Sequence, residues 1–212
     1  LQADGVILMT NTGEKSQSYE AVSMPIVFVD RRLDEMGQTS VIEADHYAGG
    51  KLAAEYLIAC GCRQITCIRG PQELSSGKKR YEGYREVCRQ HSMKERFVDS
   101  TYKYEDGAKA AEEVLRRYPD TDGIIACNDM TAVSVYKVLQ KRGYRVPEDI
   151  QIIGFDGVKF GRFLTPELTT VAQPIKEMGK CAVQMILGTV KELPRDREMK
   201  FPVMLIKGET TK

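Results

Sequence analysis

The sequence predicts an α/β protein built on parallel β-sheet. Short apolar runs alternate along the chain with segments of helical periodicity, which is typical of strands joined by crossover helices. The apolar runs are nearly continuous, as expected for strands that helices cover on both faces. With 212 residues, the chain can bury a sizeable core and form one large domain or two small ones.

Five apolar runs are the expected strands. They comprise residues 5–9, 25–29, 64–68, 123–127 and 150–155. Isoleucine and valine, which favour strands, are frequent in these runs. The sequence contains no internal repeat and no low-complexity segment that would point to another architecture.

Amphipathic segments between the runs are the expected helices. They comprise residues 51–60, 106–118, 130–142 and 176–187. Gly61 and Gly143 follow two of them, as expected of a helix C-cap. Residues 73–79, which contain two serines and a glycine, are expected to form a loop, after which Arg80 begins a further helical segment.

Composition narrows the functional class. The formal net charge is +1, so no basic excess indicates a nucleic-acid or anionic membrane surface. No apolar run reaches the length of a membrane span, and the first residues lack the pattern of a signal peptide. We therefore expect a cytoplasmic protein that does not contact membranes.

The six cysteines predict neither a metal site nor a disulfide framework. Cys60, Cys62 and Cys67 are close in sequence, but their C-x-C-x4-C spacing is not a zinc pattern. Cys67 and Cys127 lie inside apolar runs, where a thiol packs as a small hydrophobic group. Reduced thiols, with no metal and no cofactor, are expected.

Polar side chains gather where the expected strands end, and the carboxyl ends of parallel strands are where ligands bind in open α/β sheets. These residues are Asp30, Arg31, Asn128, Asp129 and Asp156, with Arg80 after the loop at 73–79. Carboxylates accept hydrogen bonds from hydroxyl groups, guanidinium groups donate them, and amides do both. Such a set suits a neutral polyhydroxylated ligand.

Catalysis is not predicted. His46 and His91 are the only histidines, and neither lies at the end of an expected strand. The sequence has no Gly-x-Gly-x-x-Gly segment and no phosphate-binding Gly-Lys-Ser/Thr loop. Without a nucleophile paired with a base, the pattern indicates binding and not an enzyme.

Most of these residues, and the further candidates Tyr102 and Gln173, also have an ordinary structural interpretation. Asn128 or Asp129 could cap the helix that follows. Asp30 with Arg31 could form a solvated turn pair, and Arg80 could be one more surface charge. Tyr102 could be a core or surface aromatic residue. Gln173 alone indicates nothing.

Several motifs in a fixed order resemble a known family. They are Met24–Arg31, Asp45 with Gly49, Arg80–Tyr84, Asn128–Met130, Val146–Asp156 and Thr165–Pro174. Together they resemble the effector-binding module of the lactose/galactose repressor family of bacterial transcription regulators. The resemblance covers essentially the whole chain. Lys207-Gly208-Glu209-Thr210 departs from the customary Arg-x-Ser/Thr near the end, and Cys62 replaces a histidine.

The resemblance implies two doubly wound parallel-sheet lobes of the periplasmic-binding-protein type I, with the ligand in a cleft between them. By similarity, residues 1–44 and 174–202 form the amino-terminal lobe, and residues 45–173 and 203–212 the carboxyl-terminal lobe. The chain would cross between the lobes near Ala44, Pro174 and Pro202. The first strands of the amino-terminal lobe and the family's helix-turn-helix head are expected to precede this segment.

The resemblance also implies roles for individual residues. Asp30 would accept hydrogen bonds from sugar hydroxyls, and Arg80 would donate to a hydroxyl or ring oxygen. Tyr102 would stack on the sugar ring, and Asn128 and Asp156 would bind further hydroxyls. The expected ligand-binding set is completed by two residues that match ribose-binding proteins, Arg31 and Gln173. Ribose is therefore the first ligand to test.

The implied function is that of a sugar-responsive transcription regulator, homodimeric, which binds operator DNA through a head outside this chain. The alternative is a periplasmic-type sugar-binding protein of a transporter. The six cysteines and the Val146–Asp149 motif favour the regulator. An enzyme on the same scaffold is the third and least favoured interpretation.

Overall fold

The computed structural model describes residues 3–9, 24–30, 40–188 and 198–212. The chain divides into two compact units. One comprises Leu1–Asp45, Glu73–Ser76 and Pro174–Pro202, and the other comprises His46–Gln72, Gly77–Gln173 and Val203–Lys212. Residues 73–76 group with the first unit, whereas the boundaries expected from the sequence placed them in the second. The assignment of these units as two lobes of one binding module stays a prediction.

The described residues of the first unit form a four-stranded parallel sheet in the order β1-β2-β3-β9. Its strands are β1 (Val6–Leu8), β2 (Ile26–Val29), β3 (Ser40–Ala44) and β9 (Glu198–Phe201). Helix α5 (Ile175–Ile186) packs on this sheet through the buried side chains of Met178 and Ala182. The sequence did not predict β3 and β9, because both include a charged residue and neither forms a long apolar run.

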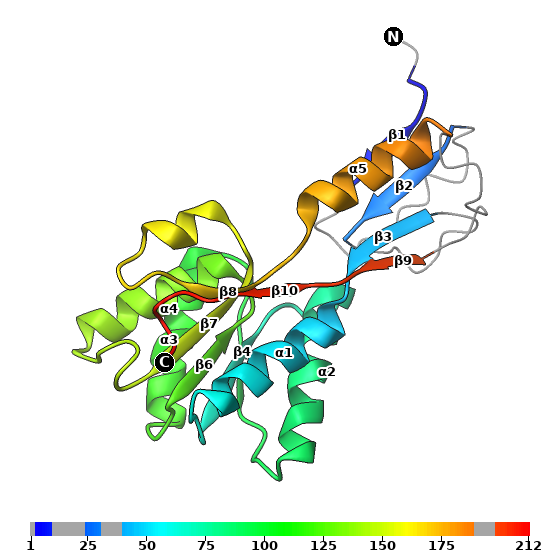
Figure 1. Cartoon of the computed structure of the whole chain (residues 1–212). Coiled ribbons are helices and arrows are strands. Elements are labelled where there is room, and N and C mark those ends of the chain that lie inside the picture. Colours follow the sequence, from blue (N-terminus) through cyan, green and yellow to red (C-terminus); the bar gives the residue numbers. More distant parts are fainter. Residues whose placement is uncertain (1–2, 10–23, 31–39, 189–197) are drawn as a thin grey trace. The chain divides into compact units, whose positions relative to one another are not determined.

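The second unit contains a six-stranded sheet in the order β10-β8-β7-β6-β4-β5, in which only β10 is antiparallel (Figure 1). Its strands are β4 (Ile65–Arg69), β5 (Phe97–Asp99), β6 (Gly123–Ala126), β7 (Gln151–Asp156), β8 (Thr169–Ala172) and β10 (Met204–Ile206). Strands β4, β6 and β7 confirm the runs predicted from the sequence. The sequence did not predict β5, β8 and β10, which have at most four residues.

Helices cover both faces of this sheet. The four helices are α1 (His46–Ala59), α2 (Ser75–Gln90), α3 (Tyr104–Arg117) and α4 (Asp129–Lys141), and a short 3-10 helix, η1 (Lys159–Phe163), follows β7. Ile153 packs with α1 and α2, and its neighbour Ile152 packs with α3 and α4. Because successive strand residues face opposite sides, the double covering explains the continuous apolar runs.

The loop expected at residues 73–79 was wrong, because α2 already begins at Ser75. Gly77 suggested a loop, but it lies within the helix. A Cβ atom at this position would lie 2.3 Å from the carbonyl oxygen of Pro71, so the glycine permits a close approach of the backbone. Arg80 therefore does not begin a helical segment but lies inside α2.

The last residues of the chain belong to the second unit and are firmly bonded there. The Thr210 hydroxyl accepts a hydrogen bond from the backbone of Thr169 (2.9 Å) and donates one to the carbonyl of Ile152 (2.8 Å). The Thr211 hydroxyl lies 2.8 Å from that of Thr169. The departure from the family pattern at residues 207–210 thus leaves a threonine that bonds to both β7 and β8.

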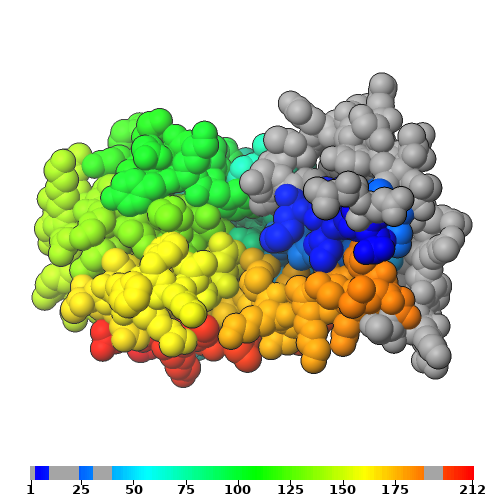
Figure 2. Space-filling model, turned by 90° about the horizontal axis from the view of Figure 1, so that it is seen from above, coloured from blue at the N-terminus to red at the C-terminus, as the bar shows by residue number. Residues whose placement is uncertain are grey.

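The cysteines predicted to pack in the core, Cys67 and Cys127, are buried. All six cysteines are free thiols. Within the described ranges, no helix is long and apolar enough to cross a membrane. The surface of the second unit includes the segment around η1, seen in yellow in Figure 2, where the Phe163 side chain is 85% exposed.

Candidate functional site

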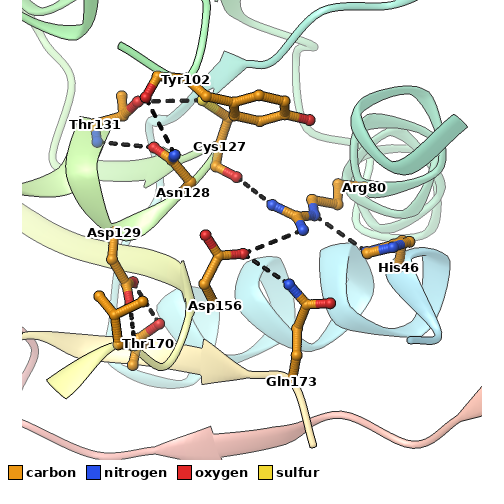
Figure 3. A network of polar contacts seen from close by, with 11 residues as sticks. His46, Arg80, Tyr102, Cys127, Asn128, Asp129, Thr131, Asp156, Thr170 and Gln173 are labelled. Carbon is orange, nitrogen blue, oxygen red and sulfur yellow. Dashed lines mark hydrogen bonds and ion pairs between the residues drawn. The ribbon is translucent and has the colours of Figure 1, made fainter. Parts of the chain in front are cut away.

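Arg80 is the centre of a polar network at the carboxyl ends of the strands of the second unit (Figure 3). Its Nη1 donates to the carbonyl oxygen of Cys127 (2.6 Å) and its Nη2 to Asp156 Oδ1 (3.3 Å). Its Nε donates to Nδ1 of His46 (3.3 Å). The side chain is only 10% exposed, so these contacts hold the guanidinium in a largely buried position. The interpretation of Arg80 as a surface charge is therefore wrong.

Two glycines bring Arg80 to this position by letting α1 and α2 cross closely. A Cβ atom on Gly50 of α1 would lie 2.0 Å from the Arg80 carbonyl oxygen. On Gly83 of α2 it would lie 2.2 Å from the carbonyl oxygen of Tyr47. At both positions a side chain would meet backbone, which cannot move aside easily. The guanidinium carbon of Arg80 then lies 3.7 Å from the ring centroid of Phe155, within range of a cation–π interaction.

Asp156 receives two of the donors in this network. It is the last residue of β7 and has a φ of 116°, which is rare for a residue other than glycine. Its Oδ1 accepts hydrogen bonds from Arg80 and from Nε2 of Gln173 (2.8 Å). The side chain remains 28% exposed, and a carboxylate offers about four acceptor sites. The carboxylate can therefore accept further hydrogen bonds from a ligand.

Gln173 lies just after β8, and the two ends of its side-chain amide differ in their hydrogen bonding. Its Nε2 donates to Asp156, and its backbone N donates to the Asp156 carbonyl (3.2 Å). Its Oε1 is buried, and no hydrogen-bond partner for it is found in the described part of the chain. An unsatisfied buried acceptor costs roughly 1–3 kcal/mol. A ligand hydroxyl that donates to this oxygen would recover that cost.

Asn128 caps α4, as one of the structural interpretations predicted. Its Oδ1 accepts from the backbone N of Thr131 (2.8 Å), and its Nδ2 donates to the carbonyl of Tyr102 (3.4 Å). The cap does not use all of the amide's hydrogen-bonding capacity. Binding of a ligand by Asn128 therefore stays a prediction.

Tyr102 lies beside this cap with its ring directed toward the helix that carries Arg80 (Figure 3). The ring packs against the backbone of Gly70, where a Cβ atom would lie 2.8 Å from ring atom Cε1. The side chain is half-buried. A rigidly packed, partly open ring can serve as a stacking surface for a sugar, but its contact with a ligand stays a prediction.

Asp129 is almost completely buried, with 1% of its surface exposed. Its Oδ2 accepts from the backbone N of Val158 (2.8 Å), and its Oδ1 accepts from the Thr170 hydroxyl (2.6 Å). Burial raises the pKa of this carboxyl to about 6, although its hydrogen bonds to Thr170 and Val158 oppose the change. Asp129 thus binds neighbouring protein groups.

The remaining two expected site residues follow β2 in the first unit. Asp30 has a φ of 72°, and its backbone N donates to the carbonyl of Ile42 (2.7 Å). Asp30 and Asp156 are thus both aspartates in the left-handed region at the end of a strand, and such backbone outliers occur often at functional sites. Arg31 lies outside the described residues.

Sequence reasoning missed His46. This residue is fully buried and begins α1, two residues after the end of β3. Because β3 was not predicted, His46 was not expected at a strand end. The available signal was the apolar pair Val41-Ile42, which lies a few residues before Asp45 and His46. Through its contact with Arg80, His46 helps to hold the guanidinium in position.

The chemistry of the assembled groups favours binding. Burial raises the pKa of the Cys127 thiol to about 11, so the sulfur is not a thiolate at neutral pH. Among the described residues, no group of histidine, cysteine and carboxylate side chains could hold a metal ion. What the network offers is a carboxylate, a guanidinium and an amide, each fixed by neighbouring protein atoms.

Comparison with known proteins identifies the family. The family model of the periplasmic binding protein-like domain matches residues 54–211. The chain belongs to this family. This periplasmic binding protein-like chain is 34% identical over 210 residues to the ribose operon repressor of Halalkalibacterium halodurans, which covers 99% of the chain and 62% of that protein. Against the ribose operon repressor of Bacillus subtilis the identity is 37%, over 98% of the chain and 63% of the relative.

A solved structure supports the fold of the periplasmic binding protein-like chain. The complex of the transcriptional regulator CelR with cellobiose superposes with a TM-score of 0.90 at 29% identity, covering 98% of this chain and 65% of that one. The predicted α/β fold of periplasmic-binding-protein type, with parallel sheets, is therefore confirmed. So is the resemblance to repressors of the lactose/galactose type. These relatives are transcription regulators. The chain spans less than two thirds of the length of both ribose operon repressors.

Proposed function

We propose that this chain is the effector-binding module of a sugar-responsive transcription regulator. The observation that carries the proposal is the network of Arg80, Asp156 and Gln173 at the carboxyl ends of the strands. It combines a partly open carboxylate, a buried guanidinium and a buried amide oxygen. Buried polar groups of this kind match the hydroxyl groups of a carbohydrate. The names of the relatives, ribose operon repressors, make ribose the first candidate.

The proposed ligand-binding residues are Asp30, Arg31, Arg80, Tyr102, Asn128, Asp156 and Gln173. Asp156 accepts hydrogen bonds from sugar hydroxyls in addition to those from Arg80 and Gln173. The Gln173 amide oxygen accepts another, and Tyr102 packs against the ring. The proposal that Asp30 and Arg31, in the other unit, also bind the ligand rests on the sequence pattern alone.

The regulatory mechanism that this function implies is a shift between two states. Ribose changes operator affinity only to the extent that it binds one state more tightly than the other. DNA binding through a separate head, homodimerisation and a cytoplasmic location belong to the same proposal, supported by the repressor relatives. The alternative is a sugar-binding protein of a transporter, and a gel-shift assay of the whole protein on its upstream DNA, with and without ribose, discriminates the two.

The binding proposal is tested by calorimetric titration of the whole protein with ribose, followed by other pentoses, hexoses, disaccharides and purines. We expect saturable binding of one sugar. Asp156→Ala should weaken it at least 100-fold, because two lost hydrogen bonds to a charged group cost about 1.5–3 kcal/mol each. Asp149→Ala is the matched control, since Asp149 is bonded to Arg145 on the exposed surface. Binding by Asp156→Ala at the affinity of the unmodified protein would show that the assignment is wrong.

A further inference from the structure

Ligand binding does not explain why the carboxylate of Asp129 is buried. It is a carboxylate with 1% of its surface exposed, and burying a charge is costly unless hydrogen bonds compensate. The Val158 backbone and the Thr170 hydroxyl donate hydrogen bonds to it. As the first residue of α4, it also lies at the positive end of that helix. The two hydrogen bonds join Asp129 to the turn after β7 and to strand β8.

The Val158 contact closes the turn that presents Asp156. Asp156 and Gly157 have φ values of 116° and 76°, two consecutive residues in a region that side chains disfavour. Holding a non-glycine residue there costs on the order of 1–3 kcal/mol and requires support from its surroundings. The hydrogen bond from the backbone N of Val158, the next residue, to Asp129 Oδ2 supplies such support.

The Thr170 contact joins Asp129 to the strand that leads to Gln173. Thr170 lies in β8 opposite Gly154 of β7, and Asp156 lies opposite Ala172 in the same ladder. Gly154 leaves the space that the carboxylate occupies, since a Cβ atom there would lie 2.3 Å from Asp129 Oδ1. One carboxylate therefore joins the turn after β7, which presents Asp156, to β8, the strand that leads to Gln173.

We infer that Asp129 is a positioning residue that sets effector affinity by holding the turn at residues 156–158, without touching the effector. The part of this inference that concerns affinity rests on the proposed function. The part that concerns the turn does not, because it can be measured in the protein without ligand.

The first measurement is hydrogen exchange of the whole protein without ligand, read at the amides of residues 155–160. In Asp129→Ala, we expect exchange there to become at least tenfold faster. Asp129→Asn should retain most of the protection, because its amide oxygen can accept from Val158 and its NH2 group can donate to the Thr170 hydroxyl. The matched control is Asp122→Ala. Asp122 accepts from the backbone of Arg63 (2.7 Å) and Gln64 (2.8 Å) just before β6, at the other end of that strand from Asp129.

The second measurement is titration with ribose. We expect Asp129→Ala to weaken binding at least tenfold, Asp129→Asn by no more than about threefold, and Asp122→Ala not at all. If Asp129→Ala does not fold, Thr170→Val removes one of the two contacts and should weaken binding about threefold.

Unchanged protection of residues 155–160 in folded Asp129→Ala overturns the inference, whether or not ribose binds. Equal losses of affinity in the Asp129→Ala and Asp122→Ala variants also overturn it, because they would indicate a general loss of stability. If the protein binds none of the sugars while Asp129→Ala loses protection of the turn, the proposed function fails and the positioning of Asp156 stands.

Discussion

At the scale of single residues, the site contains polar residues that their neighbours hold in energetically costly conformations or environments. Asp156 has a left-handed backbone, Gln173 has a buried amide oxygen, and Asp129 is a buried carboxyl with a raised pKa. Each of these states costs free energy in the folded chain. Their occurrence together at one edge of the sheet supports the proposed ligand-binding site.

Asp129 should make stability depend on pH in a defined direction. Its folded pKa, about 6, is above the ordinary value of 3.8, so the folded chain holds this proton at pH values where the unfolded chain releases it. The free energy of unfolding contributed by this group is therefore largest below pH 4 and falls as the pH rises to about 6. Over two pKa units the change is about 3 kcal/mol.

The Asp129→Asn variant tests this prediction, because its side chain does not titrate. Urea denaturation of both proteins between pH 4 and pH 7 should show that the unmodified protein loses stability relative to the variant as the pH rises. A difference in unfolding free energy that stays constant across this range would contradict the raised pKa.

At the scale of elements, helix packing places the guanidinium of the site. Arg80 lies inside α2, and the close crossing of α2 with α1 depends on glycine at positions 50 and 83. The same crossing puts His46, at the start of α1, within hydrogen-bonding distance of Arg80. A substitution in the interface between α1 and α2 should therefore change both the stability of the protein and the position of Arg80 in the site.

Gly50→Ala tests the crossing. The added Cβ atom would lie 2.0 Å from the carbonyl oxygen of Arg80, so the helices must separate, and we expect a loss of about 1–3 kcal/mol in unfolding free energy. Gly179→Ala in α5 is the matched control. Among the described residues, no atom outside the neighbouring backbone of α5 lies within 4 Å of its added Cβ, so this change should stabilise the protein by about 0.5–1 kcal/mol. Chemical denaturation of the two variants measures both values, and equal effects would contradict the interpretation.

At the scale of the whole molecule, the two units differ in how their sheets are covered. The sheet of the second unit has a buried cluster on each face, formed with two helices on either side. In the described part of the first unit, α5 is the helix that packs on the four-stranded sheet. Because apolar burial is the main stabilising term, the second unit should resist local opening more strongly.

Hydrogen exchange of the whole protein measures this difference. We expect the slowest amides in the central strands β4, β6 and β7 of the second unit, and faster exchange in β1 and β2 of the first. The ratio should be at least tenfold, since each factor of ten corresponds to about 1.4 kcal/mol of opening free energy. Uniform protection across the two sheets would show that the units open together.

The sequence by itself determined the α/β class, the strands with long apolar runs and the polar residues that follow them. These features are local, because burial on both faces of a strand requires an uninterrupted apolar run. It also indicated through its motifs the family to which the chain belongs. It did not reveal the strands β3, β5, β8, β9 and β10, which are short and whose pairing depends on neighbouring strands.

Only the tertiary structure decided how the site is assembled. Arg80 and Asp156 are 76 residues apart, and their contact depends on helix crossing and strand order, which no local pattern encodes. The expected loop at 73–79 failed for the same reason, because Gly77 meets a requirement for close packing against Pro71. Only the structure likewise showed that Asn128 caps α4 and that Asp129 accepts a hydrogen bond from the turn at residues 156–158. Residue types indicate which chemistry is available, and packing in three dimensions decides which atoms meet.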